Sequence, residues 1–415
     1  MAKTSEKTRS ILVPTYMQEF KCIGSSCEDS CCVGWRVSID QDTYKKYKKN
    51  RNQDLKPLLD QNITRQRSNS SVENYAKIKM EKGGRCSFLS EDNLCKVQST
   101  LGEDLLSNTC ATYPRTFNAV NNIVEKSATM SCPEAARLAL LNPNGIDFVE
   151  TEEPADTRGF LTKSLSLENP AYNGKPQQYF WELRIFTIEV LQNRNYSLED
   201  RLITLGMFYQ SIQKQIDQGN VEQIPNLVDS YRKLISSSEL RTSLTNIPVN
   251  LAIQMKLCKE LIEYRLGQGI SHQRYLECIN ETLSGIQYSE NDSLDEMMVR
   301  YQVALENYYK PFIKEYEYIL ENYLVNYVFK NMFPLGKKSL FDDYVMLIIH
   351  FSMIKLHLIG MSSYHKGITT DLTVKLIQSF SKIVEHNDSF LRKVFDLFEE
   401  NGFTTMAYMS ILIKN

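Results

Sequence analysis

Cysteine is concentrated in the first third of this chain. Of ten cysteines in 415 residues, eight lie before residue 133, and the other two are Cys258 and Cys278. The eight are Cys22, Cys27, Cys31, Cys32, Cys86, Cys95, Cys110 and Cys132. Thiolate sets without histidine bind zinc as Cys₄ or an iron–sulfur cluster, and all five histidines lie beyond residue 270. The segment is therefore predicted to fold around a metal centre, since a bound metal adds folding free energy to a loop-rich segment.

The spacing of these cysteines favours a cluster over a zinc finger. Zinc fingers usually present two CxxC pairs, whereas the uneven spacing of Cys22, Cys27 and Cys31 suits ligands gathered from several loops. Because side chains of adjacent residues diverge, Cys31 and Cys32 are expected to have different roles. One four-iron cluster takes at most four cysteines, so a subset of the eight is expected to ligate it.

Other interpretations of the cysteines remain open. They could be redox-active thiols, or thiols buried as small apolar residues. Disulfides are the weaker alternative, because the opening residues lack the apolar stretch of a secretory signal and the expected compartment is reducing.

Charge and hydropathy narrow the possible partners. With 48 Lys and Arg against 50 Asp and Glu, the formal net charge is −2, which gives no electrostatic basis for binding nucleic acid or an anionic membrane. The most apolar run, residues 344–360, is interrupted by His350, Lys355 and His357 before it could span a bilayer. We therefore expect a cytoplasmic, monomeric protein, with structural roles for His350 and His357.

The composition changes along the chain and predicts a mainly α protein in two parts. A loop-rich cysteine-cluster module with short β segments is assigned to residues 1–142. Residues 143–176, rich in Pro, Gly, Asn and acidic side chains, are expected to be a linker. Residues 177–415 are expected to form an all-helical domain.

Hydrophobic periodicity and turn residues define the expected elements. Helices are predicted at 177–194, 198–218, 221–236, 250–267, 272–284, 294–330, 340–360, 370–385 and 388–400. Capping boxes at Ser293 and Ser339 support two of the helix starts, and Pro311 is expected to break or kink the longest helix.

Short strands and isolated core residues complete the expected elements. Short strands are expected at residues 35–39 and in a hairpin over residues 115–132 that turns at Asn121 and Asn122. Trp35, Cys258 and Cys278 are expected to be core residues.

Four sequence blocks, in order over about residues 14–142, resemble the flagellin lysine-N-methylase family. They are CIGSSCEDSCCVGW, GGRCSFLSEDNLC, CATYPR and SCPEAARL. The family shares this cysteine region with small zinc- or iron-chelating proteins, and its total length and helical C-terminal part are similar to those of this chain. The resemblance implies methyl transfer from S-adenosylmethionine to lysine ε-amines of flagellin, with a [4Fe-4S] cluster needed for activity.

The residues themselves limit how such a transfer could work. No strand–GxGxG–helix signature and no CxxxCxxC triad is present, so the donor pocket is expected around the cluster or at the domain junction. A lysine ammonium has no lone pair and must lose its proton before it can attack a methyl group. Candidate bases near the cysteines are Tyr113, Glu103, Asp104 and Glu134. Arg115 either pairs with the donor's carboxylate through a bidentate fork or caps a turn.

Two functions of other classes compete with the methyltransferase. One is a non-catalytic zinc- or iron-chelating protein in which the metal only stabilises the fold. The other is a thiol redox sensor without a stoichiometric metal.

Overall fold

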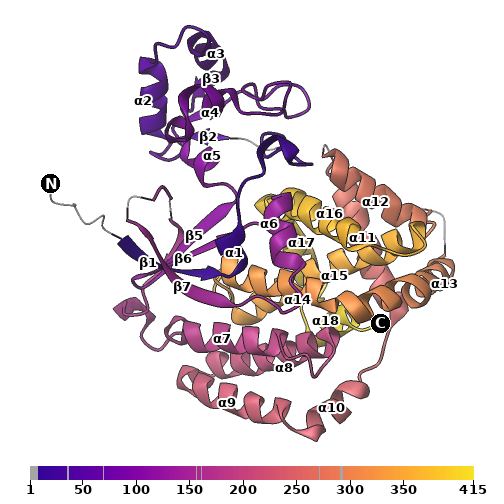
Figure 1. Ribbon diagram of the computed structural model, residues 1–415. Coiled ribbons are helices and arrows are strands. Elements are labelled where there is room, and N and C mark those ends of the chain that lie inside the picture. The colour runs from indigo at the N-terminus through magenta and orange to yellow at the C-terminus, as the bar shows by residue number, and fades with distance from the viewer. Residues whose placement is uncertain are drawn as a thin grey trace. The chain divides into compact units, whose positions relative to one another are not determined.

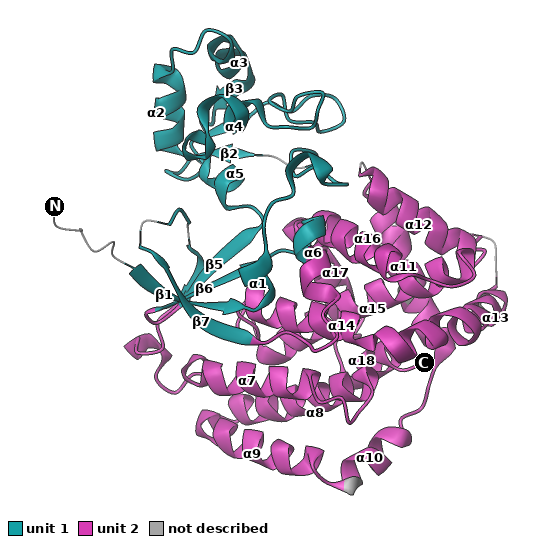
Figure 2. Ribbon diagram, in the orientation of Figure 1, with its two compact units in different colours: residues 1–119, 123–135, 148–164 teal, residues 120–122, 136–147, 165–415 magenta. Residues whose placement is uncertain are grey.

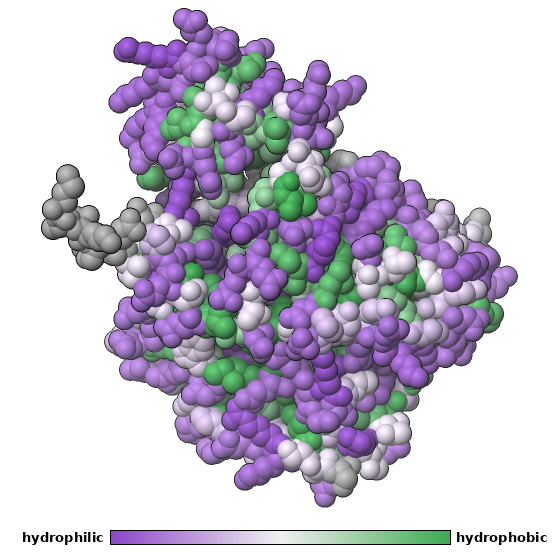
Figure 3. Space-filling view, in the orientation of Figure 1, coloured by the Kyte–Doolittle hydropathy of each residue, from purple (hydrophilic) through white to green (hydrophobic). Residues whose placement is uncertain are grey.

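The chain folds into two units (Figure 2). Unit 1 comprises residues 1–119, 123–135 and 148–164, and unit 2 comprises residues 120–122, 136–147 and 165–415. The computed structural model describes residues 8–34, 37–68, 70–155, 157–159, 161–270, 272–289 and 293–415, without the side chains of Ser238, Cys258 and Leu294. Trp35 and the side chain of Cys258, both expected in a core, lie outside this description. Hydrophilic side chains predominate on the face shown in Figure 3.

A five-stranded mixed sheet forms the base of unit 1 (Figure 1). Its strands are β1 (Thr8–Pro14), β5 (Arg115–Val120), β6 (Ile123–Ala128), β7 (Phe148–Pro154) and β8 (Leu161–Leu165), in the order β7-β1-β6-β5-β8. β1 pairs with β6 in parallel and with β7 in antiparallel orientation. The predicted hairpin is confirmed as β5 and β6, and Asn121 in its turn has a φ of 52°, a conformation that asparagine tolerates better than most residues.

The segment expected as a linker contributes β7 and β8 to this sheet. β7 pairs with β1 along its whole length, from Phe148 opposite Pro14 to Pro154 opposite Thr8. Its acidic side chains suit an edge strand, where charge discourages pairing with other chains. Glu153, the buried one, pairs with Arg9 at 2.6 Å and with Lys126 at 2.8 Å. The prediction of a linker was therefore wrong for the residues of β7 and β8, because an acidic segment next to proline can also form an edge strand.

The cysteine-rich part of unit 1 is an insertion between β1 and β5 with a small core of its own. Its elements are η1 (Gly24–Ser26), β2 (Ser38–Ile39), α2 (Gln41–Lys49), α3 (Leu55–Asn62), β3 (Ile63–Arg65), β4 (Ala76–Ile78), α4 (Lys96–Leu101), η2 (Glu103–Leu105) and α5 (Asn108–Thr112). The three short strands pair in the order β2-β4-β3. Val37, Ile39, Leu55 and Phe88 are among the buried residues of this core. The short helix α1 (Tyr16–Glu19) precedes the insertion, and α6 (Pro133–Leu140) lies between β6 and β7.

Unit 2 is built from helices, which confirms the mainly α prediction. They are α7 (Phe180–Leu191), α8 (Leu198–Asp217), α9 (Ile224–Ile235), α10 (Ser238–Thr245), α11 (Leu251–Gly267), α12 (Gln273–Gly285), α13 (Leu294–Ala304), α14 (Lys310–Lys330), α15 (Leu340–Tyr364), α16 (Thr370–Phe380), α17 (Asp388–Glu400) and α18 (Met406–Ile413). Short 3-10 helices lie before α7, as η3 (Pro170–Tyr172) and η4 (Pro176–Tyr179), and before α9, as η5 (Val221–Gln223). The predicted helical ranges hold to within a few residues, whereas α10 and α18 were not predicted.

The central helix of unit 2 is α15, which packs against α8, α12, α16 and α18. Contrary to the expectation from the sequence, it is long and apolar enough to cross a membrane by length and composition, but its apolar stretch is entirely buried within the fold. His350 and His357 are buried on it, and their Nδ1 atoms bond the carbonyls of Met346 and Met353 at 2.8 and 2.7 Å. Both histidines therefore have the structural position that was predicted.

Two π-helical segments interrupt the helices of unit 2. η6 (Leu305–Tyr309) joins α13 to α14, and η7 (Ser381–Glu385) extends α16. A break or kink was predicted at Pro311. The π segment η6 ends just before this proline, which occupies the first turn of α14, whereas the kink in α14 lies at Tyr316, with φ −116° and ψ 22°. Single-turn π segments of this kind often occur at functional sites.

Candidate functional site

Five of the eight N-terminal cysteines surround one small cavity in unit 1. The cavity has a volume of about 70 Å³, and its cysteines are Cys31, Cys32, Cys86, Cys95 and Cys110. Tyr47 and Tyr113 complete its wall together with apolar side chains of the insertion. Residues separated by about eighty positions in sequence are thus brought together, as the metal-centre hypothesis predicts.

Backbone bridges across the insertion position the first three cysteines. The amide of Cys86 donates to the carbonyl of Cys32 at 2.8 Å, and the amide of Gly34 donates to Gly84 at 3.0 Å. Gly84 has a φ of 76°, and a Cβ there would lie 3.4 Å from the backbone nitrogen of Gly34. A glycine is therefore favoured where the two loops meet.

The other two cysteines of the cavity lie at the starts of short helices. Cys95 is the residue before α4, and an isolated bridge joins it to Leu89. Cys110 lies in the first turn of α5, where its amide donates to the Ser107 side chain at 3.3 Å. Asp40 ties α5 to α2, because its carboxylate accepts from the amides of Thr43 at 2.9 Å and Asn108 at 3.0 Å.

The thiols of the cavity influence one another's protonation. Hydrogen bonds from the Cys32 thiol to Cys31 and Cys86, together with burial, raise the pKa of Cys32. The same hydrogen bond lowers the pKa of Cys86, although burial opposes it. Burial raises the pKa of Cys110 to about 12. Cys86 is therefore the thiol of this group in which the thiolate, the form that binds metals, is favoured by its neighbours.

The remaining three N-terminal cysteines form a second group outside this cavity. Cys22 is exposed, and the Cys27 thiol lies 3.4 Å from the carbonyl of Asp29. Burial and, to a smaller extent, the nearby charges of Cys27 and Cys22 raise the pKa of Cys132 to about 12, although backbone hydrogen bonds oppose the shift. The eight predicted candidate ligands thus divide into five around the cavity and three beside one another elsewhere in unit 1.

The cysteine cavity matches a thiolate-bound centre in its donor type. None of the nine cysteines with described side chains forms a disulfide. In the described part of the chain, no three His, Cys, Asp or Glu side chains are placed to hold a metal ion. A [4Fe-4S] cluster takes four cysteine ligands, and five thiols line this cavity. Which of them ligate stays a prediction.

The predicted catalytic residues occupy different environments. Tyr113 lines the cavity, and its hydroxyl lies 3.0 Å from the Ser131 hydroxyl. Burial raises the pKa of Tyr113 well above its usual value, and the charge of Cys132 adds to this. Glu103 and Asp104 are exposed and do not line the cavity. Of Tyr113, Glu103 and Asp104, Tyr113 is therefore the one that lines the cysteine cavity, and its raised pKa keeps it a neutral phenol.

The predicted donor-binding residue, Arg115, is the first residue of β5. Its guanidinium lies 5.2 Å from the ring centroid of Phe20, within cation–π range. It does not line the cysteine cavity. Its role in binding a carboxylate stays a prediction.

Two residues of this region were not predicted. Tyr47 lies within the basic run of α2, yet it is 4 % exposed and lines the cavity. Its signal was helical spacing, because the buried Thr43 lies one turn before it. Arg158, between β7 and β8, donates to the carbonyl of Leu106 at 2.5 Å and to the side chain of Asn108 at 2.9 Å. A single arginine outside any motif gave no sequence signal for this contact.

Comparisons with known proteins cover both parts of the chain. A family model described as the FliB lysine N-methylase C-terminal domain matches residues 184–412, more than half of the chain. A lysine-N-methylase of Salmonella typhimurium is 25% identical over 391 residues, which cover 92% of this chain and 93% of the relative. The flagellar biosynthetic protein FliU of Salmonella muenchen is 35% identical over 141 residues, 34% of this chain and 82% of the relative. No solved structure matches the chain.

Proposed function

This chain belongs to the FliB lysine N-methylase family, and on that premise we propose that it methylates the ε-amines of lysine residues in flagellin. The observation that carries the proposal is the match of the family domain to residues 184–412, together with a named lysine-N-methylase that covers 92% of the chain. The name of the FliU relative supports a flagellar substrate. The proposed compartment is the cytoplasm, where thiols without disulfides are the common state.

The proposed methyl donor is S-adenosylmethionine. When bound, it supplies an electrophilic methyl group on a sulfonium sulfur. The lysine amine forms the new C–N bond with its lone pair, the C–S bond breaks with its electrons going to sulfur, and the amine loses a proton. The chain must therefore bind the amine and take up its proton, since a lysine in water is an ammonium with a pKa near 10.4. Tyr113 is the proposed proton-handling residue beside the cysteines, a role for which its phenol must first be ionised. Arg115 is the proposed partner of the donor's carboxylate.

A [4Fe-4S] cluster is the proposed second cofactor. Cys31, Cys32, Cys86, Cys95 and Cys110 are the residues from which its ligands would come, because their side chains surround one cavity. Such a cluster would hold the loops of the insertion together and would shape the surroundings of Tyr113.

The decisive experiment is methylation of purified flagellin by the full chain. Protein purified without oxygen is mixed with flagellin and S-adenosylmethionine, and the intact mass of flagellin is measured. We expect increases in whole methyl units that map to lysines and that require the donor. An unchanged flagellin mass with iron-loaded, folded enzyme would refute the proposal.

A non-catalytic metal-chelating protein is the second candidate. One observation favours it: the cysteine cavity lies within the small core of the insertion. A metal at this position would stabilise the fold without needing to take part in a reaction. This candidate predicts stoichiometric zinc or iron and no change in the mass of flagellin. Metal analysis together with the methylation experiment therefore separates the two functions.

A further inference from the structure

Unit 2 contains a cavity of its own, with a volume of about 190 Å³. A stripe along η6 and α14 lines one side of it, at the four-residue spacing of a helix face: Leu305, Tyr309, Ile313 and Glu317. The opposite side comes from Leu198 and Glu199 in the first turn of α8 and from Phe351 of α15. The cavity thus lies beside one of the two π-helical segments.

Two carboxylates of this cavity are held in place by buried cations. Glu199 Oε1 accepts from Lys355 Nζ at 2.5 Å, and Glu317 pairs with Arg201. Lys355 and Arg201 are 2 and 1% exposed and do not line the cavity, whereas Glu199 and Glu317 are 27 and 33% exposed. The buried cations therefore hold the two carboxylates in position. The charged groups of these four residues that a ligand in the cavity would meet are the carboxylates.

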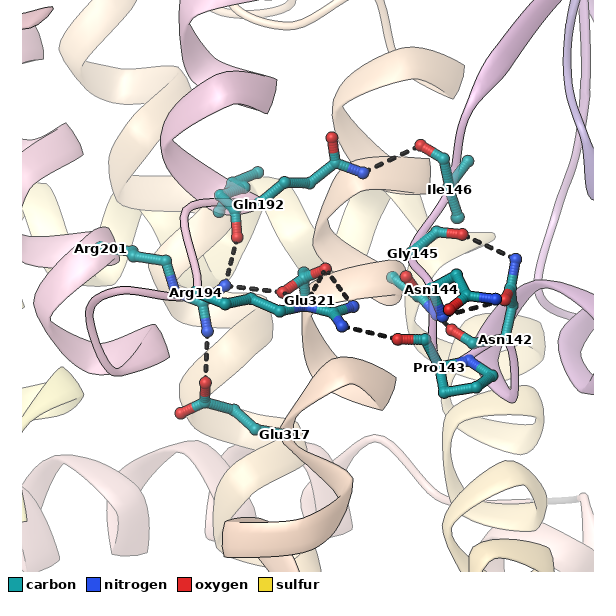
Figure 4. A network of polar contacts seen from close by, with 12 residues as sticks. Asn142, Pro143, Asn144, Gly145, Ile146, Gln192, Arg194, Arg201, Glu317 and Glu321 are labelled. Atoms are coloured by element: carbon teal, nitrogen blue, oxygen red, sulfur yellow. Dashed lines mark hydrogen bonds and ion pairs between the residues drawn. The ribbon is translucent and has the colours of Figure 1, made fainter.

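A wider ion-pair network stabilises Glu317 (Figure 4). Arg201 also donates to Glu321 at 2.7 Å, and Arg194 pairs with Glu321 at 2.8 Å. Glu317 Oε1 additionally accepts from the amide of Leu198 at 2.8 Å. Glu317 is accordingly engaged on both oxygens, whereas Oε2 of Glu199 has no hydrogen bond within the described part of the chain.

Tyr309 adds a polar group to the same wall. The residue is only 4% exposed, and its hydroxyl has no hydrogen-bond partner among the described residues. Burial raises the pKa of Tyr309, and the charges of Glu199 and Glu317 raise it further, so the phenol stays neutral. Lys310 also lines the cavity, but its Nζ pairs with Glu306 at 2.6 Å.

These groups define the chemistry of a ligand. Anions would be repelled by the two carboxylates, whereas an amine, which offers hydrogen-bond donors, fits Glu199 Oε2 and the Tyr309 hydroxyl. Leu305, Ile313 and Phe351 provide apolar contacts for an alkyl chain. The volume corresponds to about six water molecules at ~30 Å³ each and is below the ~300 Å³ of sites for drug-sized ligands. A short alkylamine therefore fits, and a nucleoside-sized ligand does not.

We propose that this cavity binds the alkylamine end of a lysine side chain, with Glu199 and Tyr309 as its polar contacts. The identity of the occupant as a lysine of the flagellin substrate rests on the proposed function. Tyr113 does not line this cavity, so the lysine bound here is distinct from the amine that would react beside Tyr113. The preference for an alkylamine rests only on the cavity.

The test measures binding of n-butylamine to the full chain, without methyl donor, by ligand-observed NMR. n-Butanol, which has the same chain without the amine, is the matched probe. We expect Glu199→Gln to weaken n-butylamine binding about tenfold, since a hydrogen bond to a charged group is lost, and Tyr309→Phe to weaken it several-fold. Glu189→Gln is the control, because Glu189 forms a surface ion pair with Arg232. Tyr309→Phe also keeps the proposal testable if Glu199→Gln fails to fold after Lys355 loses its carboxylate partner.

The outcomes separate this proposal from the enzymatic one. Absence of n-butylamine binding, equal binding of n-butanol, or unchanged binding in a folded Tyr309→Phe variant would overturn the amine site. If n-butylamine binds as expected but flagellin is never methylated, the amine-binding site is supported and the proposed methylation of flagellin is refuted. If flagellin is methylated with an unchanged KM in both variants, a substrate lysine is rejected as the occupant.

Discussion

At the scale of residues, the cysteines carry the most specific hypothesis. The sequence predicted that thiols far apart in the chain would meet, and five of them do so around one cavity. Their spacing could not indicate which five, because loop paths decide which side chains point inward. The backbone hydrogen bond from Cys86 to Cys32 forms because the loop around Gly34 lies against the loop around Gly84. This contact joins segments far apart in the sequence, so no local sequence pattern could predict it.

Replacing the cavity cysteines one at a time tests their role as ligands. We expect Cys86→Ser, Cys95→Ser and Cys110→Ser each to lose most of the iron that the wild type retains after anaerobic purification, because serine is a poor ligand for iron–sulfur clusters. Iron and sulfide analysis of the purified variants measures this. Cys278→Ser is the matched control, since Cys278 is fully buried in unit 2 and lies 3.9 Å from the Ser379 hydroxyl. Full iron retention in all three variants would exclude these cysteines as ligands.

At the scale of elements, helices were predictable and strands were less so. Helix starts carry local signals, and both predicted capping boxes, at Ser293 and Ser339, are confirmed. β7 carries no such signal, because its partner β1 lies more than 130 residues away. The π segments were not predicted either, since one extra residue in a turn leaves the apolar spacing almost unchanged.

The π segment η7 provides a test by pH. Its Glu385 is 6% exposed and pairs with Lys330 at 3.0 Å, and the Tyr323 hydroxyl donates to it at 2.7 Å. Burial alone would raise the pKa of Glu385, but the charges of Lys330 and His350 and the hydrogen bonds outweigh it and lower the pKa to about 2. Because the folded pKa is lower than the unfolded one, this carboxylate stabilises the fold above about pH 4.5. That contribution is lost as the pH falls toward 2.

The expected result is a pH-dependent difference between wild type and Glu385→Gln. At pH 7 the variant should be less stable, because Lys330 loses its buried partner. At pH 3 the difference in unfolding free energy should be smaller by roughly 2 kcal/mol. Chemical denaturation at both pH values measures it, and the exposed Glu189→Gln serves as the control. A difference that is the same at pH 7 and pH 3 would contradict the lowered pKa.

At the scale of the whole molecule, the two units differ in what stabilises them. Unit 2 surrounds the buried helix α15 with apolar contacts from several helices. The insertion in unit 1 relies on short elements and a small core that includes Cys86. Contiguous domains were predicted, whereas the units are discontinuous, because the sheet draws in residues 148–164 from the expected linker. Such pairing joins segments that are distant in the sequence, so the local composition of either segment does not predict it.

Removal of the metal should therefore affect one part of the chain selectively. If a cluster connects the loops around Cys86 and Cys110, chelation under anaerobic conditions should increase amide hydrogen exchange in α2, α4 and α5, since ligand binding and folding are coupled. Exchange in α15 should stay as in the untreated protein, because its protection comes from apolar packing. Mass spectrometry of peptides from both units measures the two rates in one experiment. The Cys86→Ser variant should show the same pattern without chelator. Equal increases in both units, or no increase in the insertion, would mean that the thiols do not hold a metal on which the fold depends.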